Sequence, residues 1–176
     1  MYLITYVIFG IVLAVLSLSL YRRMRDATPV LMQVATAVGL IWAVALVASG
    51  LIFNFGAETV ADLYGAHPDQ AVAVWQAIEP VTEGLGGAAG EILGGLWMLL
   101  VSGAVLRTRA LPKSLGWLGA AIGLLGIVSV VPALRDAGMA FGLLQIVWFA
   151  WTGIVMLRTT EPEVERVVPS PEVAPV

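Results

Sequence analysis

The chain contains five apolar stretches that are each long enough to cross a lipid bilayer, and this feature limits the fold more than any other. They cover residues 1–20, 29–53, 84–106, 114–133 and 138–157. A helix of about 20 apolar residues spans the hydrocarbon core, and inside lipid a helix pairs its own backbone polar groups. Hydrophobic residues make up 60% of the sequence, which leaves too little polar surface for a soluble domain. We therefore expect an all-α transmembrane protein whose single domain, residues 1–158, is a compact bundle of about five membrane-spanning helices.

The positions of the basic residues predict the orientation of the bundle. Five consecutive crossings place seven cations on one side of the membrane and only Arg135 on the other. The seven are Arg22, Arg23, Arg25, Arg107, Arg109, Lys113 and Arg158. Because short cytoplasmic loops are enriched in lysine and arginine, we expect the N-terminus outside and the C-terminus in the cytoplasm. Residues 159–176 are rich in proline and acid, which predicts a disordered cytoplasmic tail.

The one long connection, residues 54–83, is expected outside the membrane. It carries five acidic residues and no lysine or arginine. Asn54, Phe55 and Gly56 indicate that the second helix stops there. Residues 69–79 have the pattern of an amphipathic helix, which we expect along the membrane interface with Trp75 at headgroup depth. Pro80 then predicts a kink into the third span.

Glycines recur at helical spacing in two of the apolar stretches. Gly86, Gly90 and Gly94 repeat every four residues in the third stretch, and the fourth contains Gly119 and Gly123. Small residues let two helix backbones approach closely in lipid, where no hydrophobic force drives helices together. The spacing is that of a glycine zipper, and we expect these glycines to pack helices within the chain rather than to form a dimer.

Glu91 is the one acidic residue inside an apolar stretch. Glycines at positions 87, 94 and 95 are its helical neighbours, so its carboxyl group is expected to point into the bundle. Gln145 in the fifth stretch falls at the same depth and is the expected hydrogen-bond partner. The predicted polar layer in the outer half of the bundle comprises Glu91, Gln145, Ser49, Ser129, Asn54 and Arg135.

Three interpretations of Glu91 are open. An acid near the centre of a membrane helix costs roughly 2.5–3.5 kcal/mol, which favours a protonated side chain that donates a hydrogen bond to Gln145. The second interpretation is a proton or cation site, and the third is the floor of a cavity that opens to the outside. One acid without a second buried charge makes a poor relay, so the structural role is preferred.

The sequence gives no pattern for a catalytic, metal or cofactor site, and we expect none. The absence of cysteine excludes disulfides, thiolate metal sites and Fe–S clusters. His67 is a single histidine in a loop without metal-binding spacing, and the only lysine, Lys113, lies in a cytoplasmic loop. The expected partner is the lipid bilayer, with a membrane-protein partner or a second copy as further candidates and no nucleic acid. The tryptophans within spans are expected to pack rather than to form a cofactor pocket.

Four segments of the sequence resemble a known family. They are LIWAVALVASGLIFNFG (40–56), GEILGGLW (90–97), LPKSLGWLGAAIGLLGIVSVVPAL (111–134) and FGLLQIVWFAWTGIVMLR (141–158). They are similar to small bacterial membrane proteins defined by a domain of unknown function, the one numbered 4386, and the resemblance covers most of the chain after Tyr21. It implies a bacterial inner-membrane location and brings no activity, cofactor or catalytic residue.

The leading functional hypothesis is therefore non-enzymatic binding. The ligand would be a lipid or small apolar molecule in the outer half of the bundle, or a partner membrane protein. A proton- or cation-coupled transporter that uses Glu91 is the alternative, and it requires a water path through the bundle. An intramembrane enzyme ranks third, because no second group completes acid–base chemistry with Glu91.

Overall fold

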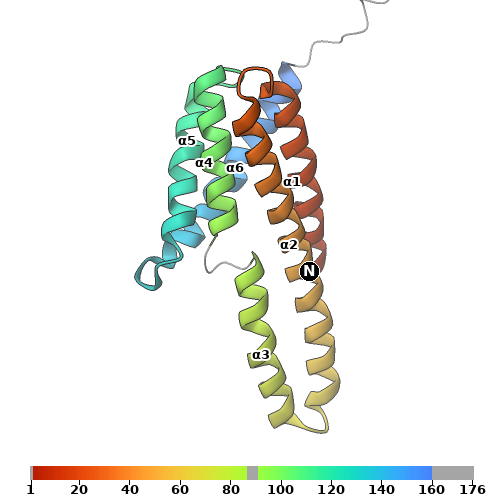
Figure 1. Cartoon of the computed structure of the whole chain (residues 1–176). Helices are drawn as coiled ribbons and strands as arrows, with labels where there is room; N and C mark the ends of the chain where they lie inside the picture. Colours follow the sequence, from red (N-terminus) through yellow and green to blue (C-terminus); the bar gives the residue numbers. More distant parts are fainter. Residues whose placement is uncertain (1, 87–90, 160–176) are drawn as a thin grey trace, which may run out of the picture.

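The computed structural model describes residues 2–86 and 91–159, and every regular element in these ranges is a helix (Figure 1). The elements are α1 (Tyr2–Met24), α2 (Pro29–Tyr64), α3 (Pro68–Gly86), α4 (Ile92–Thr108), α5 (Lys113–Val128), the 3-10 turn η1 (Pro132–Leu134) and α6 (Asp136–Arg158). Helices α1, α2 and α6 are long and apolar enough to cross a membrane, whereas α4 and α5 are apolar but have 17 and 16 residues. The expected all-α class is confirmed, and the chain has the helices of a multi-pass membrane protein.

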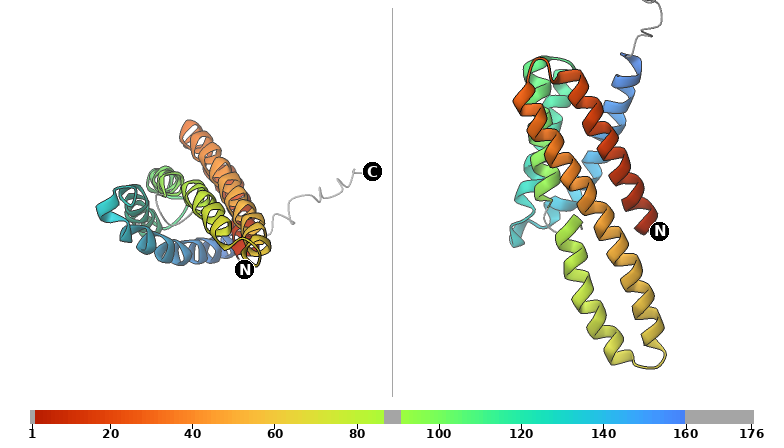
Figure 2. Two further views of the ribbon diagram at one scale, coloured as in Figure 1. Left: turned by 90° about the horizontal axis from the view of Figure 1, so that it is seen from below. Right: turned by 45° about the vertical axis from the view of Figure 1, so that its right-hand side comes forward.

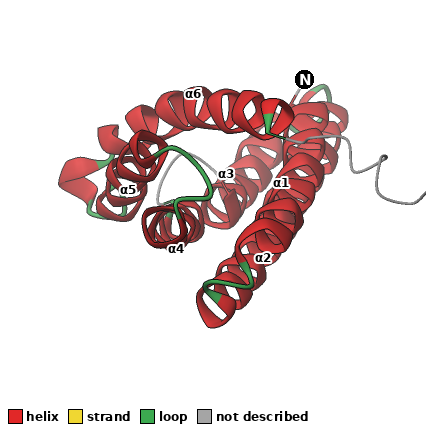
Figure 3. Cartoon of the chain, turned by 90° about the horizontal axis from the view of Figure 1, so that it is seen from above, coloured by secondary structure: helices red, strands yellow, loops and turns green. Residues whose placement is uncertain are grey.

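The helices form a bundle with one projecting hairpin. Helix α1 packs on α2, α2 on α4, α4 on α5 and α5 on α6, whereas α1 and α6 share no extensive contact. Seen along the bundle in Figure 3, α6 lies across from α4 and runs from α5 towards α1. Helix α3 and the second half of α2 extend beyond the other helices as an antiparallel pair (Figures 1 and 2).

The ends of three helices meet at one end of the bundle, which we call the cationic end. The guanidinium of Arg23 donates from Nη2 to Thr159 Oγ1 at 2.8 Å and from Nε to the Ala110 carbonyl at 3.3 Å. These contacts join the end of α1 to the α4–α5 loop and to the end of α6. The helix ends that carry the basic residues therefore lie together, as their predicted placement on one side requires.

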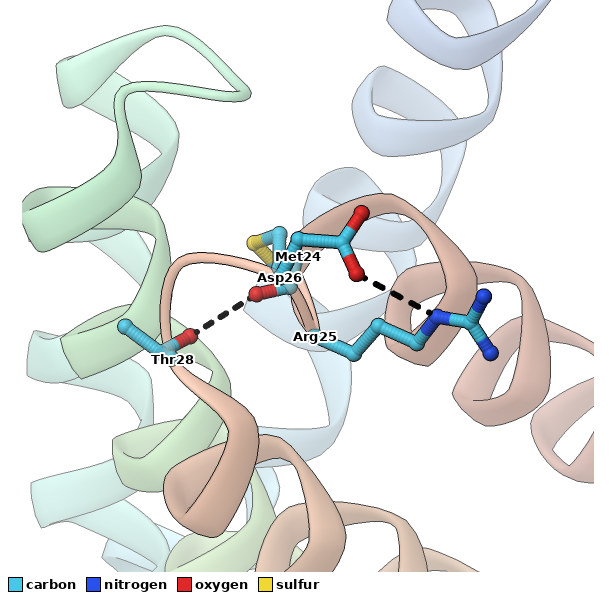
Figure 4. Close-up of polar contacts among 4 residues, drawn as sticks. All are labelled: Met24, Arg25, Asp26 and Thr28. Carbon is cyan, nitrogen blue, oxygen red and sulfur yellow. Dashed lines mark hydrogen bonds and ion pairs between the residues drawn. The ribbon is translucent and has the colours of Figure 1, made fainter.

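A tight turn connects α1 to α2 at this end (Figure 4). The Thr28 hydroxyl donates to the Met24 carbonyl at 3.1 Å, and the Thr28 N–H donates to the same oxygen at 3.1 Å. Arg25 and Asp26 form an exposed ion pair of 3.5 Å, and such pairs contribute little to stability. Pro29 begins α2, where its missing N–H costs nothing.

The predicted stop of the second helix at Asn54, Phe55 and Gly56 is wrong. Helix α2 continues to Tyr64, because α3 packs against this part of it. Gly56 lets the Ile78 side chain approach the α2 backbone, and the Trp75 ring meets the Phe53 ring edge to face at 5.3 Å. Helix α3 therefore lies along α2, and Trp75 packs against Phe53 of that helix.

The predicted third and fourth helices also differ from the structure. Helix α3 passes Pro80 and ends at Gly86, and α4 begins at Ile92, so residues 84–106 are not one continuous helix. Four of the seven residues from 84 to 90 are glycines, which lose more backbone entropy than other residues on entering a helix. Helix α5 ends at Val128 rather than near residue 133, and the 3-10 turn at Pro132 follows it.

Three tryptophan rings form the centre of the bundle. The Trp97 ring lies 6.0 Å from the Trp42 ring and 5.9 Å from the Trp148 ring, and all three side chains are buried. Such ring pairs add about 0.5–1.5 kcal/mol beyond the area that they bury. The packing expected for these tryptophans is therefore present, while Trp151 is partly exposed on the outer surface of α6.

Candidate functional site

Glu91 stands at the start of α4 rather than inside a helix. Its carbonyl accepts a hydrogen bond from Gly95 N–H at 2.8 Å, and its own N–H donates to Ser129 Oγ at 3.4 Å. Its side chain is half-buried and does not cap the helix. A carboxylate at this place interacts favourably with the positive end of the α4 dipole. This position lowers the cost of burying the acid relative to the mid-helix position that the sequence predicted.

A cavity of about 220 Å³ lies beside the Glu91 side chain. Its walls come from α1, α2 and α6 and include the rings of Tyr6, Phe9, Trp42 and Phe149. Glu91 and Gln145 are the two side chains in its lining that carry a carboxyl or an amide group. A second cavity of about 290 Å³, lined by residues of α2, α3 and α4, also reaches Glu91. Glu91 therefore lies between two cavities, and aromatic rings form part of the wall of the first.

Gln145 shares the cavity with Glu91, but the two side chains do not form the expected hydrogen bond. Gln145 is only 5% exposed, and its Nε2 has no partner among the described residues. The Trp42 indole lies against the Glu91 carboxyl group and interacts with it, although its Nε1–H does not reach full hydrogen-bond geometry. The cavity thus presents an acid beside the Trp42 indole and one buried donor, Gln145 Nε2, that has no partner in the described part of the chain.

The remaining residues of the predicted polar layer divide into two groups. Ser129 belongs to the site, because its hydroxyl accepts from Glu91 N–H and donates to the Gly126 carbonyl at 2.7 Å. Ser49 is buried but donates to the Thr82 carbonyl at 2.8 Å, so it joins α2 to α3. Asn54 and Arg135 are exposed, and no contact brings either of them to Glu91. The predicted layer of six residues is therefore reduced to Glu91, Gln145 and Ser129, with Trp42 added.

The predicted packing glycines occupy several contacts rather than one lane. Gly86 belongs to α3 and lies against Leu46, whereas Gly94 belongs to α4 and lies against Trp42 and Phe141. Gly90 lies outside the described residues, as does the predicted disordered tail beyond Thr159. Gly119 faces Ser102 and Trp148, and Gly123 faces the Gly95 carbonyl. The continuous lane through Gly86, Gly90 and Gly94 is thus wrong, because one helix ends and another begins between its members.

The side-chain groups beside Glu91 are hydroxyl, amide and indole groups. Among the described residues, no group of three or more His, Cys, Asp or Glu side chains could hold a metal ion. Glu83 in α3 is the charged side chain that acts on Glu91 electrostatically. Serine, amide and indole groups can orient a ligand, but none of them forms a nucleophile–base pair with Glu91.

Sequence reasoning missed the aromatic residues that form the cavity walls. Tyr6 and Phe9 fall within an apolar stretch, and Phe149 follows the predicted span pattern without any polar neighbour that would single it out. The spacing of Tyr6 and Phe9 at the start of α1 was the only feature of the sequence that pointed to an aromatic wall. Trp42 was noted for packing alone, since its proximity to Glu91 depends on contacts between helices far apart in the sequence.

The helical fold and its apolar spans define a multi-pass membrane protein with an internal acid beside a cavity. The chain belongs to the DUF4386 family, a domain of unknown function, whose model matches residues 1–158. The predicted family is thereby confirmed, and the match extends the resemblance to the first residue. No curated protein and no solved structure matches the chain.

Proposed function

We propose that the protein is a five-span bundle that binds a lipid or another small amphiphilic molecule in the cavity beside Glu91. The ligand would place a polar group that both donates and accepts hydrogen bonds, such as a hydroxyl, against Glu91 and Gln145. The main support is the pairing of unused polar groups with aromatic walls in one cavity. Ligand sites commonly combine apolar walls with a few polar groups that orient the ligand.

The size of the cavity limits what it can hold. Sites for whole drug-sized ligands usually measure about 300–1,000 Å³, and this cavity measures about 220 Å³. It therefore suits a polar head with the first part of a chain rather than an entire lipid. Residues of both α1 and α6 line the cavity, which supports an exit for the rest of the chain between these two helices into the bilayer, beside the Phe9–Phe149 ring contact.

Photochemical cross-linking tests this proposal. A diazirine-bearing monoacylglycerol, added to the protein in liposomes, is expected to label peptides from the start of α1 and the middle of α6. Gly142 lines the cavity, and a Cβ there would meet nothing within 4 Å, so Gly142→Leu should fill the cavity without disturbing the backbone. Labelling should fall severalfold in this variant.

Gly153→Leu is the matched control, because Gly153 lies on the same helix, also faces open space and does not line the cavity. Its labelling should equal that of the wild type. Glu91→Gln retains the shape of the side chain and should weaken labelling less than Gly142→Leu. Equal labelling of the wild type and Gly142→Leu would contradict binding in this cavity.

The proposed topology places the cationic end in the cytoplasm, with α4 and α5 as short spans. At about 1.5 Å per residue they extend roughly 25 Å, somewhat less than the hydrocarbon thickness of about 30 Å. Because the chain has no cysteine, single-cysteine variants report accessibility without further changes. In intact cells a membrane-impermeant maleimide should label Thr59→Cys and should label Ala110→Cys only after permeabilisation. The reverse pattern would contradict the proposed orientation.

A further inference from the structure

A series of buried polar atoms continues from the Glu91 cavity towards the cationic end, and apart from Trp42 Nε1, which lies against the Glu91 carboxyl group, none of them has a hydrogen-bond partner in the described part of the chain. They are Trp42 Nε1, Gln145 Nε2, Trp97 Nε1, Ser17 Oγ, Ser102 Oγ and Thr152 Oγ1. Each of these side chains is at most 5% exposed. Their burial is thus nearly complete, although they come from four different helices.

These atoms occupy successive levels along the bundle. Trp42 and Gln145 line the cavity, and the Trp97 ring follows at 6.0 Å from the Trp42 ring. At this second level Ser17 Oγ and Trp97 Nε1 face the same point, since both are nearest to where a Cβ on Gly39 would stand. The hydroxyl and the indole are therefore close neighbours without being bonded to each other.

The third level repeats this arrangement around Gly119. Ser102 Oγ and Trp148 Nε1 are the atoms nearest to where a Cβ on that glycine would stand, and the Trp148 ring lies 5.9 Å from the Trp97 ring. Thr152 follows one turn beyond Trp148 on α6. In both places a glycine provides the space in which a hydroxyl and an indole meet.

Unpaired polar atoms at this depth are costly. Each buried group without a partner costs about 1–3 kcal/mol in proteins, and lipid offers no substitute partner. Buried polar groups that lack protein partners are usually satisfied by ordered water. Five such atoms at successive levels therefore favour internal hydration over five separate desolvation costs.

We propose that these side chains bind a file of water molecules that carries protons between the Glu91 cavity and the level of Ser102 and Thr152. Glu91 would then exchange its proton with the cytoplasmic half of the bundle as well as with the outer side. This is the property that a proton-coupled carrier requires. The inference does not depend on a lipid ligand, because it concerns side chains beyond the cavity.

Hydrogen exchange at the indole nitrogens tests the proposed file of water molecules, and Trp148 in the same chain serves as the reference. Trp97 and Trp148 are both 0% exposed, but Trp148 Nε1–H donates to the Leu115 carbonyl at 2.9 Å. The protein in lipid, labelled with ¹⁵N at its indoles and assigned with single Trp→Phe variants, would be transferred to D₂O and followed by NMR. Trp97 should exchange about tenfold faster than Trp148, the ratio expected for one hydrogen bond, and Trp42 should also exchange fast.

Exchange at Trp97 as slow as at Trp148 would show a dry interior, with Ser17 bonded directly to the indole, and would overturn the proposal. Ser17→Ala removes one water-binding group and should slow exchange at Trp97 severalfold while leaving Trp42 unchanged. Ser19→Ala is the control, since the Ser19 hydroxyl is already bonded to the Val15 carbonyl at 2.8 Å. Fast exchange at Trp97 that Ser17→Ala does not alter would also contradict the file. None of these results depends on monoacylglycerol labelling, so the two proposals can fail separately.

Discussion

Two helical hairpins of this protein, α4–α5 and α2–α3, are held together by different means. In α4–α5 the backbones themselves meet, because Gly95 and Gly123 each lie against the other's carbonyl oxygen. In α2–α3 side chains make the contact, with Trp75 on Phe53 and Ile78 over Gly56. Only Ala71 and Thr82 of α3 are buried, whereas nearly half of the residues of α4 are buried. Helix backbones therefore approach each other closely in the core of the bundle, whereas looser side-chain contacts join the two helices of the projecting hairpin.

The largest expected difference concerns one tryptophan from each hairpin. Trp97 is fully buried and contacts Trp42, Trp148 and Phe149, so Trp97→Ala should lower the free energy of unfolding by about 3–5 kcal/mol. Trp75 is half-buried with one ring contact, so Trp75→Ala should cost about 1–2 kcal/mol. Unfolding in mixed micelles measures both values. Equal losses would show that α2–α3 contributes as much to the fold as the bundle does.

A smaller effect is expected from adding one methyl group to each glycine contact. A Cβ on Gly123 would stand 2.8 Å from the Gly95 carbonyl oxygen and 3.0 Å from Leu99 N, and these backbone atoms cannot move aside alone. Gly123→Ala should therefore destabilise by about 2 kcal/mol. Gly56→Ala meets only the Ile78 side chain and should cost about 0.5–1 kcal/mol after the gain in helix propensity. The same unfolding assay ranks the Gly123→Ala and Gly56→Ala variants. A Cβ on Gly153 would stand in open space, so Gly153→Ala should be neutral or stabilising.

A comparably small effect should come from the polar link between α2 and α3. Ser49→Ala removes the hydrogen bond to the Thr82 carbonyl, at a cost of about 1 kcal/mol. Because this bond joins α2 to α3, backbone hydrogen exchange should increase in α3 and stay unchanged in α5. Increased exchange in both helices would mean that the hairpins are not independent.

The parts of the fold that depend on local sequence were predictable. Helices α1 and α6 match their apolar stretches, and the clustering of Arg23 with the later loop and helix ends follows from counting crossings. The continuation of α2 beyond Asn54 was not predictable, because α3, distant in the sequence, stabilises it. The polar layer failed at Asn54 and Arg135 for a related reason. Depth along a helix was correctly estimated for Gln145, but the direction of a side chain depends on packing that the sequence does not display.

The contacts of Arg23 make the cationic end a fixed point for the rest of the bundle. They hold the end of α6 to the end of α1, and farther along the Phe9 and Phe149 rings join the two helices edge to face at 5.4 Å. Gln145 lies about 20 Å from this fixed end along the axis of α6. A tilt of α6 by about 5° around Arg23 would move Gln145 by about 2 Å yet leave Thr159 in place. A tilt of this kind would change the distance between α1 and α6 beside Glu91 and leave their basic ends together.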